Sequence, residues 1–454
     1  MVGNRKKSWL FFIGLLVFFW SMVALYGVGV YGDSDQYITM HVHREPLYPL
    51  FLALFRLIAG EETGLTLAAI AQGLLAACSI FALAEYLRHK FSLNMAEELV
   101  LLVLALMPHV VTKYVSALNI FLENSIMSEA LCIPLFHFFT LFTLRMIYEK
   151  KRTDMALSLF FAWLLSMTRG QMMTTILLWM LIVGVLMVIR RQYKMLLIPL
   201  LAVVCAFGMR SLSVRTYNYF VTGYFMGNTF GQVNTLTNVI YACDEEDAGV
   251  FEEGSLEREF FECFYAGADA IGANYKYGGD SFRERASHLE EYHDRLKFEV
   301  LEAEMAAYYF GIGKDYYQQN ILSDEIAKSM RAKLLPVCFG QWLYDYMLLC
   351  TDGFIRSIAV VHPLINPIAV LLYTAALGYI LWCIWRRRKS DAAWMMGTAL
   401  LFIAANVCAV SLTIMCLSRY MIYGFSMFYI ALFLAGREMV RARFGAAHKI
   451  ERVR

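Results

Sequence analysis

A small set of acidic and arginine side chains stands at the edges of long apolar segments in this sequence. Charged groups beside a membrane lose hydration, so chains that keep them there usually use them. The set consists of Asp33, Asp35, Glu129, Arg44, Arg169 and Arg419. Because these residues come from distant parts of the chain, they can act together only if the fold gathers them at one membrane face.

Carboxylates and guanidiniums together suit a displacement in which a hydroxyl attacks and a phosphate leaves. A carboxylate close to the attacking oxygen can take its proton. Arginine binds phosphate oxygens through paired N–H groups and stays charged. Phosphate is a stable leaving group that needs no general acid, so acids and arginines suffice for this chemistry.

Members of the set also have structural interpretations. Asp33 and Asp35 could cap a helix, because Asp is favoured at helix N-termini. Arg44 could reach lipid headgroups, and Glu129 could mark the boundary of an apolar segment. The sequence leaves both interpretations open at these positions.

The composition predicts an all-α polytopic membrane protein. Hydrophobic residues are 59% and charged residues 17% of the 454 residues, whereas soluble chains average about 45–50% and about 25%. The apolar excess lies in blocks of about 20 residues, the length that crosses a hydrocarbon core as a helix. A formal net charge of +2 argues against a polyanion-binding surface, so no nucleic-acid partner is expected.

We predict ten membrane-spanning helices. Their approximate ranges are 9–30, 65–87, 96–116, 125–147, 154–168, 172–189, 195–213, 364–385, 392–416 and 420–436. Lysine and arginine gather at one set of helix ends, near 5–7, 88–90, 150–152, 190–194, 386–389 and 437–443. This pattern predicts a plasma-membrane protein with both termini in the cytoplasm. Arg169 and Arg419 break the pattern, which favours a functional role for them.

Two long segments fall on the predicted outer side. The first, about 31–64, carries the aspartates, and its Pro-interrupted apolar run predicts a helix lying in the membrane interface. The second predicts short helices at 252–265, 281–309 and 323–335. We therefore expect an N-terminal membrane module, a mostly helical extracytoplasmic domain, and a C-terminal membrane module with a cytoplasmic tail, at 1–213, 214–363 and 364–454.

The cysteines and acidic runs give weaker signals. Cys243, Cys263, Cys338 and Cys350 could form two disulfides if the outer side is oxidising, with three pairings open. No cysteine has zinc-type spacing, so no cofactor is predicted, and a divalent cation is left open. The acidic run 244–247 is interpreted as a solvated loop.

Around the charged set the sequence resembles the GT-C superfamily of membrane glycosyltransferases, which includes protein O-mannosyltransferases and the bacterial lipid A aminoarabinose transferase. Bacterial members have a first outer loop with Asp-Ser-x-x-Tyr and then Arg-x-Pro-x-Tyr-Pro, which this chain matches at 33–37 and 44–49. Shorter matches follow in the family's order, at Ser128-Glu129, Thr168-Arg169 and Arg419-Tyr420. The resemblance covers about 1–200 well and about 400–440 weakly.

The resemblance implies inverting transfer of a sugar from a polyprenyl-phosphate carrier to a lipid, glycan or protein acceptor at the outer face. It implies Asp33 as the catalytic base, with Asp35 and Glu129 orienting the acceptor or assisting. It also implies that the donor phosphate is bound by Arg44, Arg169 and Arg419. Many relatives have Asp-Glu where this chain has Asp-Ser-Asp, so the choice between Asp33 and Asp35 stays open, and the spacing to Tyr37 favours Asp33.

Two other functions compete with this one. An O-antigen-type polymerase or ligase also has outer arginines, but these are expected in large late loops without the Asp-Ser-x-x-Tyr segment. A transporter or flippase for lipid-linked substrates is expected to show repeated halves and broken helices near the bilayer midplane. The chain shows no internal repeat.

Overall fold

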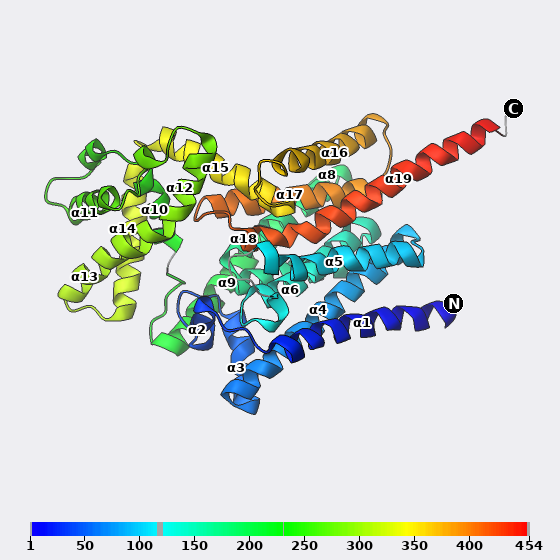
Figure 1. Ribbon diagram of the computed structural model, residues 1–454, viewed down its shortest axis with the longest axis horizontal. Coiled ribbons are helices and arrows are strands. Elements are labelled where there is room, and N and C mark those ends of the chain that lie inside the picture. The colour runs from blue at the N-terminus through cyan, green and yellow to red at the C-terminus, as the bar shows by residue number, and fades with distance from the viewer. Residues whose placement is uncertain (1, 116–120, 230, 452–454) are drawn as a thin grey trace. The chain divides into compact units, whose positions relative to one another are not determined.

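The structure is a computed structural model that describes residues 2–115, 121–229 and 231–451, with side chains described between 9 and 442 of these ranges. Over these residues the protein is all-helical (Figure 1). The single β contact among them is an isolated parallel bridge between Gly29 and Ser125. The predicted all-α class is therefore confirmed for the described part of the chain. The basic residues predicted at 5–7 lie outside the described side chains.

The chain forms two compact units. Unit 1 comprises residues 1–210, 355–406 and 418–454, and unit 2 comprises 211–354 and 407–417. The predicted domain boundaries at 213/214 and 363/364 fall within ten residues of two of these junctions. The return of 407–417 to unit 2 is a feature that the sequence did not indicate.

Unit 1 holds the long apolar helices. They are α1 (Val2–Tyr26), α4 (Glu61–Phe91), α5 (Met95–Val115), α6 (Glu129–Glu149), α7 (Arg152–Thr168), α8 (Met173–Ile189), α9 (Leu197–Thr222, whose end enters unit 2), α16 (Asn366–Trp385), α17 (Asp391–Ser411) and α19 (Phe425–Glu451). Within the described residues, nine segments are long and apolar enough to cross a membrane. Nine of the ten predicted spans therefore correspond to segments that qualify by length and composition.

The span that does not qualify is 154–168. It corresponds to α7, which has 17 residues and begins with the charged residues Arg152 and Asp154. A full crossing takes about 20 residues, so α7 is short for a span. It nevertheless packs antiparallel against α6. The contact is seen at Thr143 of α6, whose Oγ1 lies 2.7 Å from the Oγ of Ser158 in α7. The end of α7 therefore lies beside the start of α6.

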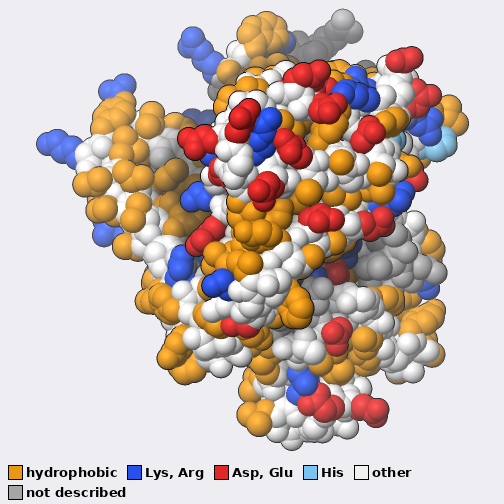
Figure 2. Space-filling model, turned by 90° about the vertical axis from the view of Figure 1, so that its left-hand side faces the viewer, with side chains coloured by type: hydrophobic (Ala, Val, Ile, Leu, Met, Phe, Trp, Pro, Cys, Tyr) orange, Lys and Arg blue, Asp and Glu red, His pale blue; other side chains and the backbone are white. Residues whose placement is uncertain are grey.

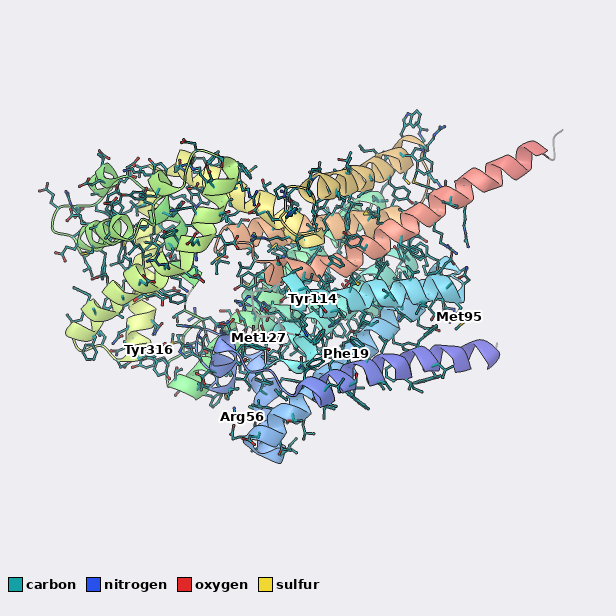
Figure 3. All side chains as sticks on the ribbon, viewed as in Figure 1. Phe19, Arg56, Met95, Tyr114, Met127 and Tyr316 are labelled. Carbon is teal, nitrogen blue, oxygen red and sulfur yellow. The ribbon has the colours of Figure 1, made fainter. Side chains whose placement is uncertain are left out.

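Burial separates the inner helices of unit 1 from the outer ones. In the span of α6, 83% of residues are buried, against 17% for α1 and α9 and 22% for α16. Apolar side chains left exposed on a long helix are typical of contact with hydrocarbon. Phe19 of α1 and Met127, just before α6, are both buried inside this unit (Figure 3). These burial differences support a multi-pass membrane arrangement.

The first outer segment contains two helices, α2 (Gly32–Ile38) and α3 (Leu47–Ala59). The predicted interfacial helix is α3, which buries Tyr48 and Leu52 while Leu57 is 87% exposed. Gly60 has a φ of +80°, which lets the chain turn directly from α3 into α4. As a result, the predicted span at 65–87 begins earlier, at Glu61.

Unit 2 is a cluster of helices around its own apolar core. They are α10 (Gly231–Tyr241), α11 (Leu256–Ala270), α12 (Phe282–Arg295), α13 (Ala303–Gly311), α14 (Tyr316–Leu334) and α15 (Phe339–Ile358, whose end enters unit 1). The predicted helix at 281–309 is one continuous element in which a π-helical turn, Leu296–Glu302, joins α12 to α13. Acidic and basic side chains are mixed over the face drawn in Figure 2.

None of the disulfides that the sequence left open is formed, because all ten cysteines are free. Cys243 and Cys338 are buried in the core of unit 2, whereas Cys263 is exposed. In the acidic run, Asp244 caps a short helix and pairs with Lys276 at 2.9 Å. Among the described residues, no group of three or more His, Cys, Asp or Glu side chains is placed to hold a metal ion.

Candidate functional site

The segment after α1 is held against the turn that precedes α6. The amide of Gly29 donates to the carbonyl of Asn124 at 2.7 Å, and the Gly29 carbonyl accepts from Ile126 at 2.8 Å. Ser34 strengthens this contact, since its hydroxyl donates to the Ile126 carbonyl at 2.8 Å and also accepts from the amide of Tyr31. The Asp-Ser-x-x-Tyr motif therefore anchors α2 beside the start of α6.

Asp33 lies between two arginines. Its Oδ1 accepts from Arg44 Nη2 at 2.8 Å, and its Oδ2 accepts from Arg419 Nη1 at 2.9 Å. Burial alone would raise the pKa of Asp33, but the two guanidinium charges outweigh burial and hold the pKa below its ordinary value. The Asp33 side chain is 31% exposed, so it is both charged and reachable from outside.

Arg44 is fixed by the same face of α2. Its Nε donates to Gln36 Oε1 at 2.8 Å, and its guanidinium lies 4.8 Å from the centre of the Tyr37 ring. Residues 33, 36 and 37 share one face because residues three and four apart are neighbours on a helix. Pro46 follows as the residue that caps α3. The two motifs of the first loop thus build one arginine–aspartate contact.

A hydrogen-bond chain joins α2 to the start of α6 and the end of α7. The Tyr37 hydroxyl lies 2.8 Å from Ser128 Oγ, which accepts from Arg169 Nη1 at 3.0 Å. Arg169 Nη1 also pairs with Glu129 Oε2 at 2.7 Å. The α6–α7 hairpin makes this pair, since it returns residue 169 to the level of residue 129.

Glu129 is almost fully buried, with 1% of its side chain exposed. Its second oxygen, Oε1, has no hydrogen-bond partner among the described residues. A buried carboxylate oxygen without a donor is costly, so this oxygen can accept a hydrogen bond from a bound water or ligand.

Arg419 enters from α18 (Ser418–Met421). Its Nη2 donates to the Tyr420 hydroxyl at 2.9 Å, and the Tyr420 ring also lies 5.2 Å from the Arg169 guanidinium. Gln171 and Asn406 each donate to the Tyr420 carbonyl at 3.0 Å, which fixes the start of this segment. One tyrosine thus contacts both arginines, with its ring 5.2 Å from the Arg169 guanidinium and 4.8 Å from that of Arg419.

Asp35 stands apart from this cluster. It is exposed, and its carboxylate makes no ion pair or hydrogen bond among the described residues. Two residues along a helix correspond to a rotation of about 200°, so Asp33 and Asp35 point to opposite sides of α2. The structure thus places five of the six predicted site residues together and leaves Asp35 outside.

The cluster has a surplus of positive charge. Arg44, Arg169 and Arg419 face two carboxylates, Asp33 and Glu129. Each arginine side chain is at most 22% exposed, so the guanidiniums are held rigidly rather than extended to bulk water. One unbalanced cation in a partly buried site is suited to an added anion such as a phosphate.

Two polar residues inside predicted spans support the cluster and were not among the predicted site residues. Arg210, within the predicted span at 195–213, forms a close ion pair with Glu45 and donates to the Ser166 carbonyl. Gln72, inside another predicted span, accepts from the Tyr48 hydroxyl at 2.8 Å. A polar residue within an apolar segment was the signal that could have found both.

Comparison with protein-family models, with curated proteins and with solved structures gives no match to this chain.

Proposed function

We propose that this protein is an inverting glycosyltransferase that moves a sugar from a polyprenyl-phosphate donor to an acceptor at the outer face of the plasma membrane. The observation that supports it most is the placement of Asp33 between Arg44 and Arg419, with the Glu129–Arg169 pair in the same network. The GT-C-like motifs account for each of these residues. Their arrangement beside long apolar helices suits a substrate with a phosphate head and an apolar tail.

The proposed reaction is a single displacement. The acceptor hydroxyl oxygen forms a bond to the anomeric carbon while the bond from that carbon to the phosphate oxygen breaks. The bonding electrons leave with polyprenyl phosphate, and the hydroxyl proton passes to Asp33. Attack from the side opposite the leaving group inverts the anomeric configuration. Arginines at the leaving phosphate stabilise the charge that develops there.

The two roles of the cluster are coupled through Asp33. While both of its oxygens accept from arginines, Asp33 is a weak base. A donor phosphate competes for the same guanidiniums, and Asp33 loses charge-assisted hydrogen bonds as Arg44 and Arg419 turn to the phosphate. Loss of these bonds raises the pKa of Asp33 and makes it a better base. Donor binding therefore prepares the base.

The first prediction compares two aspartates on one short helix. Full-length protein is incubated with a panel of polyprenyl-phosphate sugars, and released polyprenyl phosphate and glycosylated product are measured. Asp33→Asn should lower turnover by about 10²–10⁴-fold, because it removes the base and keeps the shape. Asp35→Asn is the matched control and should keep turnover near that of the unmodified protein.

Three outcomes would contradict the assignment. Normal turnover in Asp33→Asn removes this residue from the reaction, and loss in Asp35→Asn alone moves the base to the exposed aspartate. Movement of the intact lipid-linked sugar from one leaflet of a vesicle membrane to the other, without release of polyprenyl phosphate, would instead indicate a transporter. A product with retained anomeric configuration would exclude the single displacement.

A further inference from the structure

A second region of unit 1, far from the cluster, is an apolar cavity with basic residues around it. It has a volume of about 770 Å³ and lies among α6, α8, α16 and α17. It is lined by the ends of α6, α8 and α16 and by the start of α17, whereas Glu129 opens α6 at its opposite end. In Figure 1, α2 and α18 lie toward one end of the long helices of this unit, and both chain termini lie toward the other.

The walls of the cavity are apolar side chains left exposed. Leu181, Val185 and Ile189 follow one face of α8 and are 40–61% exposed, and Ile384 of α16 is 67% exposed. These helices are long and apolar enough to span a membrane. The walls therefore suit hydrocarbon chains better than water.

The lining also carries unpaired cations. Lys150, Arg190, Arg387 and Lys389 line the cavity, are exposed, and make no ion pair with a carboxylate among the described residues. The other charged lining residues are already paired, since Arg388 contacts Glu438 at 3.0 Å and Asp391 contacts Lys90 at 2.7 Å. The lining is therefore cationic overall.

Helix-end electrostatics explain only part of this arrangement. Basic residues are favoured near helix C-termini, and three of the four cations lie at the ends of α6, α8 and α16. That effect requires neither an apolar cavity nor cations that face the same space. Basic pockets between membrane helices are suited to anionic lipid headgroups.

We propose that this cavity binds an anionic phospholipid, with an acyl chain against α8 and α16 and the phosphate among Lys150, Arg190, Arg387 and Lys389. The volume lies within the range of about 300–1,000 Å³ that is typical of ligand pockets. This binding does not depend on glycosyl transfer at the other end of the helices. It would give the protein a lipid requirement of its own.

The test measures thermal unfolding of the purified full-length protein in detergent. Phosphatidylglycerol and phosphatidylcholine of matched acyl chains are titrated separately, and inorganic phosphate is titrated alone. The proposal expects a saturable rise in Tm with phosphatidylglycerol and little change with the other two. An equal rise with phosphatidylcholine would overturn it, as would an equal rise with phosphate, which would indicate an ion site.

Two pairs of variants locate the site. The double variant Arg387→Gln, Lys389→Gln should need about ten times more phosphatidylglycerol for half of the rise in Tm, because each basic residue near an anionic headgroup contributes to binding. The matched control is Arg386→Gln with Lys151→Gln, which removes two cations near the same helix ends that do not line the cavity. If both double variants weaken phosphatidylglycerol binding equally, the lipid responds only to the overall positive charge of this region, and the proposal is overturned.

A cavity-filling variant tests the apolar part. Gly397 lines the cavity, and a Cβ added there meets no atom within 4 Å, so the side chain of Gly397→Leu should extend from an open position into the cavity. Gly378→Leu on α16 is the control, because it is equally open and lies outside the lining. Gly397→Leu should abolish the phosphatidylglycerol-dependent rise in Tm, and Gly378→Leu should keep it. Retention in Gly397→Leu would overturn the placement of the acyl chain.

Discussion

Two aspartates separated by one residue have opposite surroundings in this protein. Asp33 accepts from two arginines that come from residues 44 and 419, and Asp35 faces outward from the same helix. The difference follows from helix geometry, since two residues along a helix point in nearly opposite directions, and Asp33 is also the aspartate with the motif's spacing to Tyr37. At the residue scale, therefore, chemistry is decided by which face of α2 a side chain occupies.

A buried carboxylate in unit 2 gives a pH-dependent prediction. Burial raises the pKa of Asp345 to about 6, and hydrogen bonding from Gln341 with the nearby charge of Arg285 only partly offsets it. The folded state thus holds a proton between about pH 4 and 6 that the unfolded state has released. Stability should fall as pH rises through this window. Asp345→Asn should remove that dependence and stabilise the protein at pH 7.5, by about 2 kcal/mol.

The measurement is the Tm of both proteins between pH 4 and pH 8. Asp280→Asn, at an exposed position in the same unit, controls for the loss of one negative charge. A wild-type Tm that rises with pH over this range, in a way that Asp345→Asn removes, would contradict the prediction.

At the element scale, the hairpin of α6 and α7 and the short α2 do most of the positioning. The hairpin returns Arg169 to Glu129, and the contact between Gly29 and the turn before α6 places α2 beside them. Arg56 ties α3 into this arrangement, because its Nη1 donates to the Ile38 carbonyl at 2.6 Å. Movement of α3 should therefore shift α2 and displace Asp33 from its position between the arginines.

The role of α3 in positioning Asp33 can be tested where α3 packs closely on α4. A Cβ at Gly64 would lie 2.5 Å from the Arg56 Cα and 2.8 Å from the Phe55 carbonyl oxygen, so the backbone must shift. Gly64→Ala should destabilise the protein by about 1–3 kcal/mol through overpacking and lower turnover as well. Gly14→Ala on α1 is the control, since its Cβ meets nothing within 4 Å and Ala favours helix. Tm and turnover are measured for both, and an unchanged Gly64→Ala protein would contradict this packing.

At the scale of the whole molecule, the short α7 matters for topology. Nine qualifying segments alone would predict termini on opposite sides of a membrane, but α7 returns antiparallel beside α6, and counting it as a crossing predicts both termini on one side. We therefore expect both termini on one side and the first outer loop on the other. This expectation agrees with the placement of lysine and arginine in the sequence.

Labelling of single cysteines by an impermeant thiol reagent checks this topology. In a variant with its native cysteines replaced by serine, Asp35→Cys should be labelled in intact cells and Lys151→Cys only after permeabilisation. Both positions are exposed, so access to the reagent depends on the side of the membrane. Labelling of both in intact cells, or of Lys151→Cys alone, would contradict the ten-pass arrangement.

The sequence by itself determined the helical class, most helix positions and the identity of the charged set. These features follow from local properties, namely apolar runs of spanning length and charged residues at their edges. Local signals leave α7 undecided, because its apolar run gives a helix of 17 residues, which is short for a full crossing. They also carried no expectation for α10 and α15 before the structure.

Only the tertiary structure decided which charges meet. Asp33 and Arg419 are separated by 386 positions and lie 2.9 Å apart, whereas Asp35 is excluded. Sequence spacing reports neighbours within one helix, but contacts between helices depend on how their buried faces pack, which no local pattern encodes. The same reason explains the cavity with its four cations. Each was visible as a basic residue at a helix end, and only packing placed them around one apolar space.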